Sequence, residues 1–301
     1  MKKFIAGSND AGQRLDKFLT KLLVGASKGM IYKWLRKKRV KVNGKKQDIS
    51  YMLCEGDVLE LYINDEFFKE ADGAETSRLE GALPLTVVYE DKNILVADKP
   101  SGIAAHGEDG CLLERVQGYL LRKGEYLPQS ENTFAPALCN RIDKNTSGLV
   151  IAAKTAAALR GINEKIRNRE INKYYVLKVE GRINPSEGKI SGYTLKNESE
   201  RKVYFYKTEV PGSKYCETLY RTLDSDGTVE ALLITGRTHQ IRASFAALGH
   251  PLAGDVKYGA KKNGRNDFQQ LRAYKLEFNF STPSGELEYL NGKVIQTDWK
   301  L

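Results

Sequence analysis

The first part of the chain shows helical and then strand-like spacing of apolar side chains. One set recurs at helical spacing and predicts an amphipathic helix with a single buried face: Leu15, Phe18, Leu19, Leu22 and Leu23. Ser27 is a good N-cap for a second helix, because its hydroxyl can accept a free amide of the first turn. The apolar side of that helix would consist of Met30, Ile31, Trp34 and Leu35.

Turn residues after these helices predict a small sheet. The apolar–polar–apolar run 40–42 leads into Asn43-Gly44, a strong signal for a tight hairpin turn. Gly56-Asp57 marks another turn before a short strand over residues 58–62. Residues 12–63 are therefore predicted to form a compact domain of two helices and a small sheet.

Residues 64–83 interrupt this pattern. They hold 2 basic and 6 acidic residues and lack sustained periodicity, which predicts an acidic linker. Residues 84–301 then form the second predicted domain, dominated by short strands. The predicted strands lie at 85–89, 94–97, 148–153, 173–180, 201–209, 217–223, 229–234 and 271–280.

Two helices are predicted within this larger domain. Thr155 can cap one of them, and the other begins near His239 and runs to Leu248. The apolar face of the first comprises Leu159, Ile162 and Ile166. The fold class is α+β, with a large mixed, mainly antiparallel sheet.

The distribution of charge indicates what kind of molecule the protein binds. The formal net charge is +10, and residues 1–63 alone hold 14 Lys and Arg against 6 Asp and Glu. Such a distribution favours a polyanionic partner. A solvated helix face is the alternative for a charge run, but here the run continues onto the adjacent strand and turn. We therefore expect five basic residues to form a phosphate-binding surface: Lys33, Arg36, Lys37, Arg39 and Lys41.

Cysteine spacing and hydropathy exclude several other classes of protein. The four cysteines are far apart and form no CxxC pair, so neither a zinc site nor a disulfide framework is indicated. No apolar run is long enough for a signal peptide or a membrane span. We expect a soluble, cytoplasmic protein without a metal.

The segment 140–152, NRIDKNTSGLVIA, carries the first candidate for chemistry. Asp143 lies between Arg141 and Lys144, and this positive field favours the ionised carboxylate. Glycoside hydrolysis usually requires two carboxylates, and no second acid appears in the motif-like segments. A single carboxylate suits a reaction in which the leaving group is kept and rejoined. The equally weighted alternative is that Asp143 caps the turn at residues 146–148.

Two further segments supply possible partners. In residues 235–242, TGRTHQIR, one arginine could pair with Asp143 while the other meets a phosphate. His239 has no acid nearby in sequence, which favours a structural or RNA-binding role over a catalytic one. Tyr174 and Tyr175 are adjacent on a predicted strand and must face opposite sides, so one of them can stack on a base.

Together these segments resemble the RluA-type family of RNA pseudouridine synthases. The family's aspartate signature is matched at residues 141–148, and its downstream signature at 236–242, followed by residues 248–251 and 254–255. Residues 98–102 and Lys173-x-Tyr175 match two further motifs. Residues 12–62 resemble the αL-type RNA-binding domain named after a small-subunit ribosomal protein. Two departures are Asn140, where the family commonly has His, and Asp98, where it has Asn.

The resemblance implies isomerisation of uridine to pseudouridine in RNA, without cofactor or metal. The target uridine would be flipped from its stack, Asp143 would act at its ribose, Tyr175 would stack on the base, and Arg242 would pair with Asp143. The RNA contacts at the pocket would come from Arg141, Arg237, His239 and Gln240.

Large-subunit (23S) ribosomal RNA is the preferred substrate, transfer RNA stays open, and a monomer is expected. Two other functions remain alternatives: a non-catalytic RNA-binding ribosome-assembly factor, and a glycosidase that releases free base. The joint presence of the three predicted catalytic residues favours the synthase.

Overall fold

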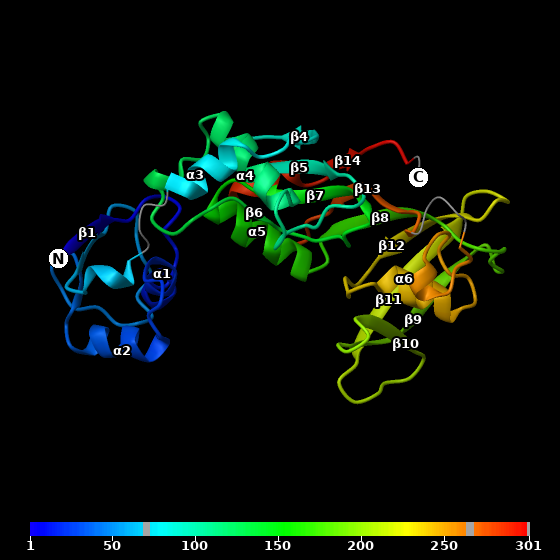
Figure 1. Cartoon of the computed structure of the whole chain (residues 1–301), viewed down its shortest axis with the longest axis horizontal. Helices are drawn as coiled ribbons and strands as arrows, with labels where there is room; N and C mark the ends of the chain where they lie inside the picture. The colour runs from blue at the N-terminus through cyan, green and yellow to red at the C-terminus, as the bar shows by residue number, and fades with distance from the viewer. Residues whose placement is uncertain (69–72, 263–267, 300–301) are drawn as a thin grey trace. The chain divides into compact units, whose positions relative to one another are not determined.

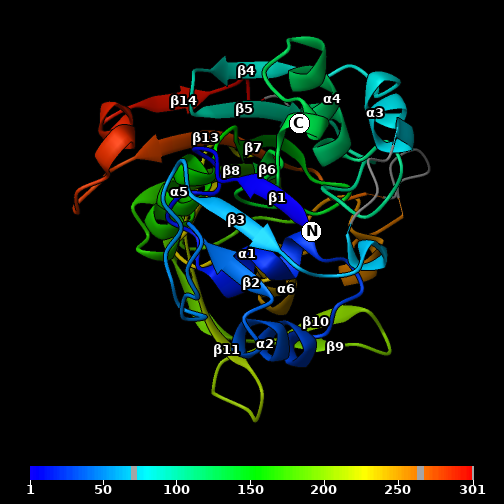
Figure 2. The same ribbon diagram turned by 90° about the vertical axis from the view of Figure 1, so that its left-hand side faces the viewer.

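The structure, a computed structural model, describes residues 1–68, 73–262 and 268–299. Contacts between residues divide the chain into two compact units. The first comprises residues 1–84, 114–137 and 154–159, and the second comprises residues 85–113, 138–153 and 160–301. Figure 1 labels most of the helices and strands, and Figure 2 adds β2 and β3.

The N-terminal part of the first unit forms as its sequence predicts. Helices α1 (Leu15–Leu22) and α2 (Lys28–Arg36) bury their apolar faces in one core. The Ser27 hydroxyl accepts the Met30 amide at 3.3 Å, which confirms the cap. Asn43 and Gly44 both have positive φ (51° and 74°), as a type I′ hairpin turn requires.

Three strands complete this part: β1 (Lys2–Ile5), β2 (Val40–Val42) and β3 (Val58–Leu61), in the antiparallel order β1-β3-β2. Figure 2 shows them side by side, with α1 and α2 next to them. Strand β1 was not predicted, because a four-residue strand at the start of a chain offers little alternation to detect.

The predicted linker is more ordered than its composition suggests. It contains η1 (Asp65–Phe67) and α3 (Gly73–Glu80), and residues 69–72 lie outside the described part. Apolar anchors explain the order. Phe68 is buried and stacks on Phe4 with a centroid distance of 5.8 Å, and Leu79 is fully buried. The unit also contains η2 (Pro128–Ser130) and most of α4 (Leu112–Arg122), a helix that was not predicted.

The second unit is built on an eleven-stranded sheet, counted over the described residues. Its main path runs β10-β9-β11-β12-β8-β13-β7-β5-β4, with β14 on β13 and β6 on β7. The strands are β4 (Val87–Glu90), β5 (Ile94–Lys99), β6 (Ala137–Leu138), β7 (Ser147–Ala153), β8 (Ile171–Lys178), β9 (Glu187–Asn197), β10 (Lys202–Tyr206), β11 (Lys214–Thr222), β12 (Thr228–Leu233), β13 (Leu271–Phe278) and β14 (Val294–Gln296). Along the main path the pairs are antiparallel except for β13 with β7, which confirms the predicted α+β class.

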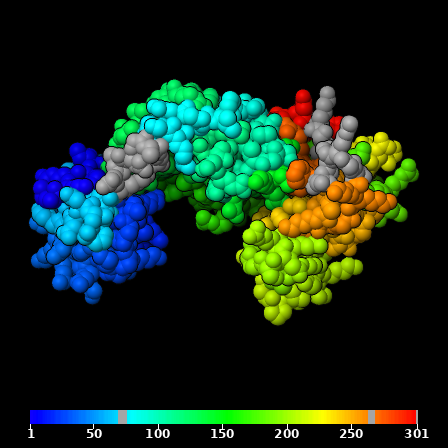
Figure 3. Space-filling model, viewed as in Figure 1, coloured from blue at the N-terminus to red at the C-terminus, as the bar shows by residue number. Residues whose placement is uncertain are grey.

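This unit also contains most of α5 (Ala156–Arg167), together with α6 (Gln240–Ala247), η3 (Val256–Tyr258) and η4 (Gly285–Leu290). The Thr155 hydroxyl accepts the Ala158 amide at 3.1 Å and caps α5, as predicted. Helix α6 packs on β9 and β10. In Figure 3 the β9–β10 region lies directly against the segment that contains η3.

One glycine sets the centre of the sheet. Gly148 has φ of 112°, and a Cβ built there would lie 2.0 Å from the carbonyl oxygen of Ala273. A larger residue would therefore push β13 away from β7. Since Ala273 also pairs with Tyr175 of β8, this close approach fixes the spacing between the loop before β7 and the pocket face of β8.

Four of the described α-helices end in the same Schellman motif, with a left-handed residue directly after the helix. Glycine fills this position after α4 (Gly124, φ 71°) and α6 (Gly249, φ 85°). Lys38 (φ 59°) fills it after α2, and Arg169 (φ 62°) fills it after α5. The left-handed conformation costs a residue with a Cβ about 1 kcal/mol relative to glycine.

Candidate active site

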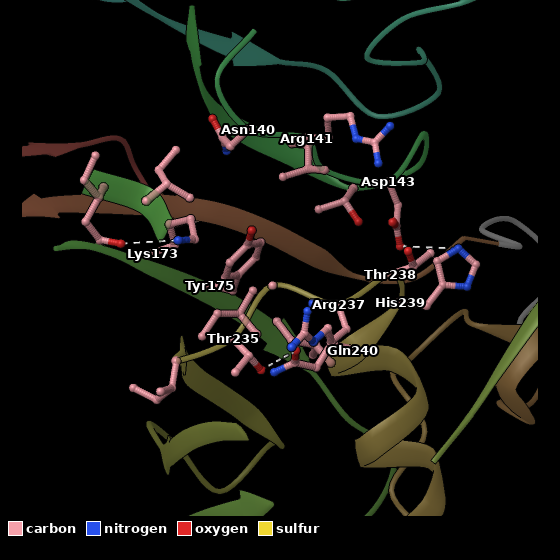
Figure 4. A pocket seen from close by; sticks show the side chains of 18 of the residues that line it. Asn140, Arg141, Asp143, Lys173, Tyr175, Thr235, Arg237, Thr238, His239 and Gln240 are labelled. Atoms are coloured by element: carbon pink, nitrogen blue, oxygen red, sulfur yellow. Dashed lines mark hydrogen bonds and ion pairs between the residues drawn. The ribbon is translucent and has the colours of Figure 1, made fainter. Parts of the chain in front are cut away.

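A cavity of about 710 Å³ opens in the second unit, beside β8 and the start of α6. Most of its lining comes from three stretches of chain: residues 139–143, residues 166–175 and residues 233–242. Figure 4 shows the side chains of Asp143 and Tyr175 on opposite sides of the same space. All residues that the sequence analysis placed at the pocket therefore lie together, although they come from distant segments.

Asp143 is the carboxylate of this pocket, and its side chain is 25% exposed. Its Oδ2 accepts a hydrogen bond from Nη1 of Arg242 at 3.1 Å, the pairing that the sequence predicted. The turn that follows is closed by its backbone, since the Thr146 amide donates to the Asp143 carbonyl oxygen at 3.0 Å. Turn capping therefore does not occupy the carboxylate, which is left to face the pocket.

Arg242 is held rigidly from behind. It is buried, and Asp255 accepts from its Nε at 2.7 Å and from its Nη2 at 2.9 Å. Burial lowers the pKa of Arg242, but the hydrogen bonds and charges of Asp255 and Asp143 outweigh that cost and the pKa is raised. A charged guanidinium fixed in this way can present one N–H to Asp143 in a defined direction.

His239 lies between Tyr258 and Asp143, two neighbours that are distant from it in the sequence. The Tyr258 hydroxyl oxygen accepts the Val203 amide at 3.0 Å and lies 2.8 Å from His239 Nδ1. The Asp143 carboxylate lies on the Nε2 side of the ring and favours the neutral tautomer with its proton on Nε2, so we assign Nδ1 as the acceptor of the Tyr258 hydroxyl. That Nε2 lies 3.8 Å from Oδ2 of Asp143.

The charge state of His239 follows from its surroundings. Burial lowers its pKa, Arg242 and Lys257 lower it further, and Asp143 partly offsets them. The ring is therefore neutral at pH 7. Its backbone is left-handed, with φ of 49°, directly before α6.

The two adjacent tyrosines of β8 divide as predicted. Tyr175 is 6% exposed and lines the pocket. Burial, together with the charge of Asp143, raises its pKa, so the phenol is neutral. Tyr174 points to the other face, where its hydroxyl donates to Glu277 at 2.9 Å and its ring lies 3.8 Å from Lys275 Nζ.

The predicted RNA contact of Gln240 needs correction. Its side chain is 2% exposed, and protein groups use its polar atoms. Its Oε1 accepts from the Thr235 hydroxyl and the Arg237 amide, and its Nε2 donates to the Glu217 carbonyl and the Thr218 hydroxyl. A buried amide with these four bonds holds the 235–239 turn in place and has no group left for RNA.

The predicted arginine contacts at the rim are accessible. Arg141 and Arg237 are exposed, and Arg237 Nε donates to the Tyr215 carbonyl at 2.9 Å while the rest of its guanidinium remains available. In the N-terminal domain Lys33, Arg36, Lys37 and Arg39 are exposed. Lys41 is half-buried, with Nζ 5.4 Å from the centre of the Tyr62 ring.

Lys99 supports the loop that carries Asp143, a role that the sequence did not predict. Its side chain is fully buried, and Nζ donates to the carbonyls of Pro100, Ile103 and Lys144 at 2.8–2.9 Å. Burial lowers its pKa to about 8. Since Lys144 follows Asp143 directly, this ammonium group anchors the backbone next to the carboxylate.

The two departures from the family pattern both have local partners. Asn140 Oδ1 accepts the Ile151 amide at 2.8 Å, which joins the loop to β7. Asp98 accepts a hydrogen bond from Arg272 at 2.6 Å. Neither departure changes Asp143, Tyr175 or Arg242.

Within the described residues, no group of His, Cys, Asp and Glu side chains is arranged to hold a metal ion. Over the same part of the chain, no helix combines the length and apolar character needed to span a bilayer.

Comparison with known proteins gives two family matches. Residues 93–247 match the RNA pseudouridylate synthase family, and residues 13–59 match the S4 domain. An uncharacterized RNA pseudouridine synthase of Mycoplasma capricolum subsp. capricolum is 34% identical over 311 residues, with 99% of both chains covered.

Two further similarities agree with these matches. The ribosomal large subunit pseudouridine synthase C of Escherichia coli K12 is 33% identical over 263 residues, which cover 86% of this chain and 80% of that protein. The solved structure of human RNA pseudouridylate synthase domain containing 4 is similar in fold. It has a TM-score of 0.57 and 22% identity, over 71% of this chain and 88% of that one.

Proposed function

The chain belongs to the RNA pseudouridylate synthase family, and we propose that it isomerises uridine in large-subunit (23S) ribosomal RNA with Asp143 acting at the ribose. The reaction breaks the bond between C1′ of the ribose and N1 of uracil, and it joins C1′ to C5. The proton on C5 is lost and N1 gains one, so the product has the composition of the substrate. No atom enters from a cofactor.

The observation that carries this proposal is the position of Asp143. It is the one carboxylate among the described residues that line the pocket, beside Tyr175 and in contact with a charged Arg242. Asp143 either attacks C1′ or removes the proton from C2′, and both routes need an ionised, oriented carboxylate. Arg242 orients the Asp143 carboxylate, because Asp255 holds the Arg242 guanidinium in a fixed position.

Tyr175 would hold the base during the rearrangement. A buried aromatic ring at the pocket wall can stack on uracil through its π face while the detached base turns. Stacking of this kind would hold the detached base in the pocket, which favours rejoining over release. His239, with its proton on Nε2, can donate to the oxygen atoms of Asp143 or of the ribose.

The preference for ribosomal RNA rests on similarity and on charge. Relatives from Escherichia coli and Vibrio cholerae are named ribosomal large subunit pseudouridine synthase C. The S4 domain carries the exposed basic residues of α2 and its following turn, which suit the backbone of structured RNA. We infer that the protein acts in the cytoplasm and that it is a monomer. Sedimentation of the purified chain would test the monomeric state.

The direct test compares the wild type with Asp143→Asn on 23S ribosomal RNA transcripts and on unmodified transfer RNA. Pseudouridine is mapped at single-nucleotide resolution, and RNA binding is measured in parallel. We expect the variant to bind 23S RNA normally and to form no pseudouridine. Asp226→Asn, in the exposed turn between β11 and β12, is the matched control and should retain full activity.

Each of the other outcomes would contradict a specific part of the proposed function. Modification confined to transfer RNA would remove the ribosomal substrate. Release of free uracil would identify a glycosidase. Binding without modification by the wild type would identify an assembly factor, and an active Asp143→Asn enzyme would exclude the carboxylate as the reacting group.

A further inference from the structure

Helix α5 ends, like α2 with Lys38, on a left-handed residue that is not glycine. After α4 and α6 the left-handed position is glycine, whereas Arg169 adopts the same conformation after α5. Its amide donates to Ile166 and the Glu170 amide donates to Lys165, which are the two bonds of the Schellman motif. The fold therefore requires a left-handed residue here, but nothing in the backbone requires arginine.

A purely structural benefit does not account for Arg169. A cation near a helix C-terminus interacts favourably with the helix dipole, but Lys165 and Arg167 already supply positive charge in the last turn of α5. A residue that breaks a local rule without a local benefit points to a function of its side chain.

Arg169 lies where such a function is available. It lines the pocket together with Arg167 and Lys173. Both arginines are exposed, and neither forms an ion pair with any residue that the structure describes. Lys173 Nζ donates to the Ile171 carbonyl at 3.3 Å. Two guanidinium groups and one ammonium group thus border one cavity with no carboxylate of their own.

The whole lining is strongly asymmetric in charge. Among the described residues it holds six Arg and Lys side chains: Arg141, Arg167, Arg169, Lys173, Arg237 and Arg242. Asp143 is its single carboxylate and is already paired with Arg242. Figure 4 shows Lys173 on one side of Tyr175, and Asp143 with His239 on the other. Cations therefore border the pocket on both sides of the ring on which the base would stack.

We propose that Arg167, Arg169 and Lys173 bind phosphate groups of the RNA strand on the side of Tyr175 that faces away from Asp143. This inference rests on the proposed function. Together with Arg141 and Arg237, these residues would hold the backbone on either side of the flipped uridine. Such contacts set the register of the strand without reading its sequence, so they serve any target uridine.

Arg169→Gly tests this proposal sharply, because glycine suits the left-handed position better than arginine. If Arg169 serves only the fold, this substitution removes strain and does no harm. If it binds phosphate, the variant unfolds at an unchanged or higher temperature, yet its Kd for 23S RNA rises about tenfold. The slope of log Kd against log salt concentration should fall by about 0.7, the loss of one phosphate contact.

Arg201→Gly is the matched control. Arg201 is also exposed and left-handed (φ 50°), but it lies in the turn between β9 and β10 and does not line the pocket. The two variants lose the same charge and relieve the same strain. Arg169→Lys should restore most of the affinity, because it keeps the charge.

Binding is measured with full-length chains that also carry Asp143→Asn, using filter binding to 23S transcripts over a series of KCl concentrations. An unchanged Kd for Arg169→Gly, or an equal loss in Arg201→Gly, would overturn the phosphate site. The proposed function is judged separately, by pseudouridine formation in the wild type. Failure of the phosphate site with intact modification would therefore leave the enzyme assignment standing.

Discussion

Substitution of Lys99 gives the most direct test of how the loop that carries Asp143 is held in place. Lys99→Met keeps the length and the apolar stem of the side chain but removes three hydrogen bonds from the ammonium group. The carbonyls of Pro100 and Ile103 lose the donor that Nζ supplied. The Lys144 carbonyl retains the Gly102 amide at 3.0 Å.

The expected loss of stability follows from two opposing terms. Hydrogen bonds from a charged donor contribute about 1.5–3 kcal/mol each, so three contribute roughly 5–9 kcal/mol. Burial of the charge lowers the pKa from 10.5 to about 8, which corresponds to about 3 kcal/mol in the opposite direction. We expect Lys99→Met to lower the free energy of unfolding by about 3 kcal/mol, since the Lys144 carbonyl keeps one partner.

The same pKa gives a pH signature. Between pH 8 and 10.5 the unfolded chain holds the Lys99 proton and the folded chain does not, so protonation opposes folding in that window. The stability of the wild type relative to Lys99→Met should therefore increase as the pH rises through it and should not change below pH 8.

Urea unfolding of both proteins across this pH range measures the effect, and a single-turnover assay measures pseudouridine formation. We expect the rate to fall about tenfold in fully folded variant protein, because the backbone beside Asp143 loses an anchor. Lys92→Met, on the exposed turn before β5, should change neither quantity. Wild-type stability and rate in Lys99→Met would refute the anchoring role.

Two further predictions concern the partners of Asp143. Tyr258→Phe removes the hydrogen bond to His239 Nδ1, so the ring should protonate more readily, form an ion pair with Asp143 and move the acid limb of the pH–rate profile to higher pH; an unshifted limb would exclude this contact as a control on His239. Asp255→Asn leaves one amide N–H group facing the Arg242 guanidinium, and kcat should fall about 10- to 100-fold with little change in KM. A rise in KM alone in steady-state assays would show that Asp255 serves RNA binding instead.

Local signals were sufficient for much of the fold. The Ser27 and Thr155 caps and the Asn43-Gly44 turn depend on neighbouring residues, and the structure confirms all three. Helix α4 was missed although its buried residues Leu112, Val116 and Leu120 recur every four positions. That signal was present in the sequence and was overlooked.

Strand β9 was missed for a physical reason. Its buried face consists of Ile190, Gly192 and Thr194, of which two are not apolar, so the alternation is hidden. Gly192 is needed because a Cβ there would lie 2.5 Å from the Phe205 ring. The strand is defined by its neighbours β10 and β11 rather than by its own propensity.

The residues of the pocket also fall into those that the sequence predicted and those that it did not. The motifs indicated Asp143, Tyr175 and Arg242, and the structure brings these three together. Lys99 and Tyr258 act through partners far away in the chain, which spacing alone does not reveal. Gln240 was misassigned because a polar residue inside a motif looks the same in sequence whether it faces a ligand or a backbone.

The position of β13 has a consequence for biosynthesis. This late strand lies between β7 and β8, which precede it by roughly a hundred residues in the chain, and it supplies the parallel pair. During translation, residues 1–63 can fold soon after they leave the ribosome, because their core contacts are local. The sheet under the pocket stays in two halves until residue 278 has emerged. A nascent chain thus has its S4 domain long before it has a working catalytic site, and newly made protein can hold RNA before it can modify it.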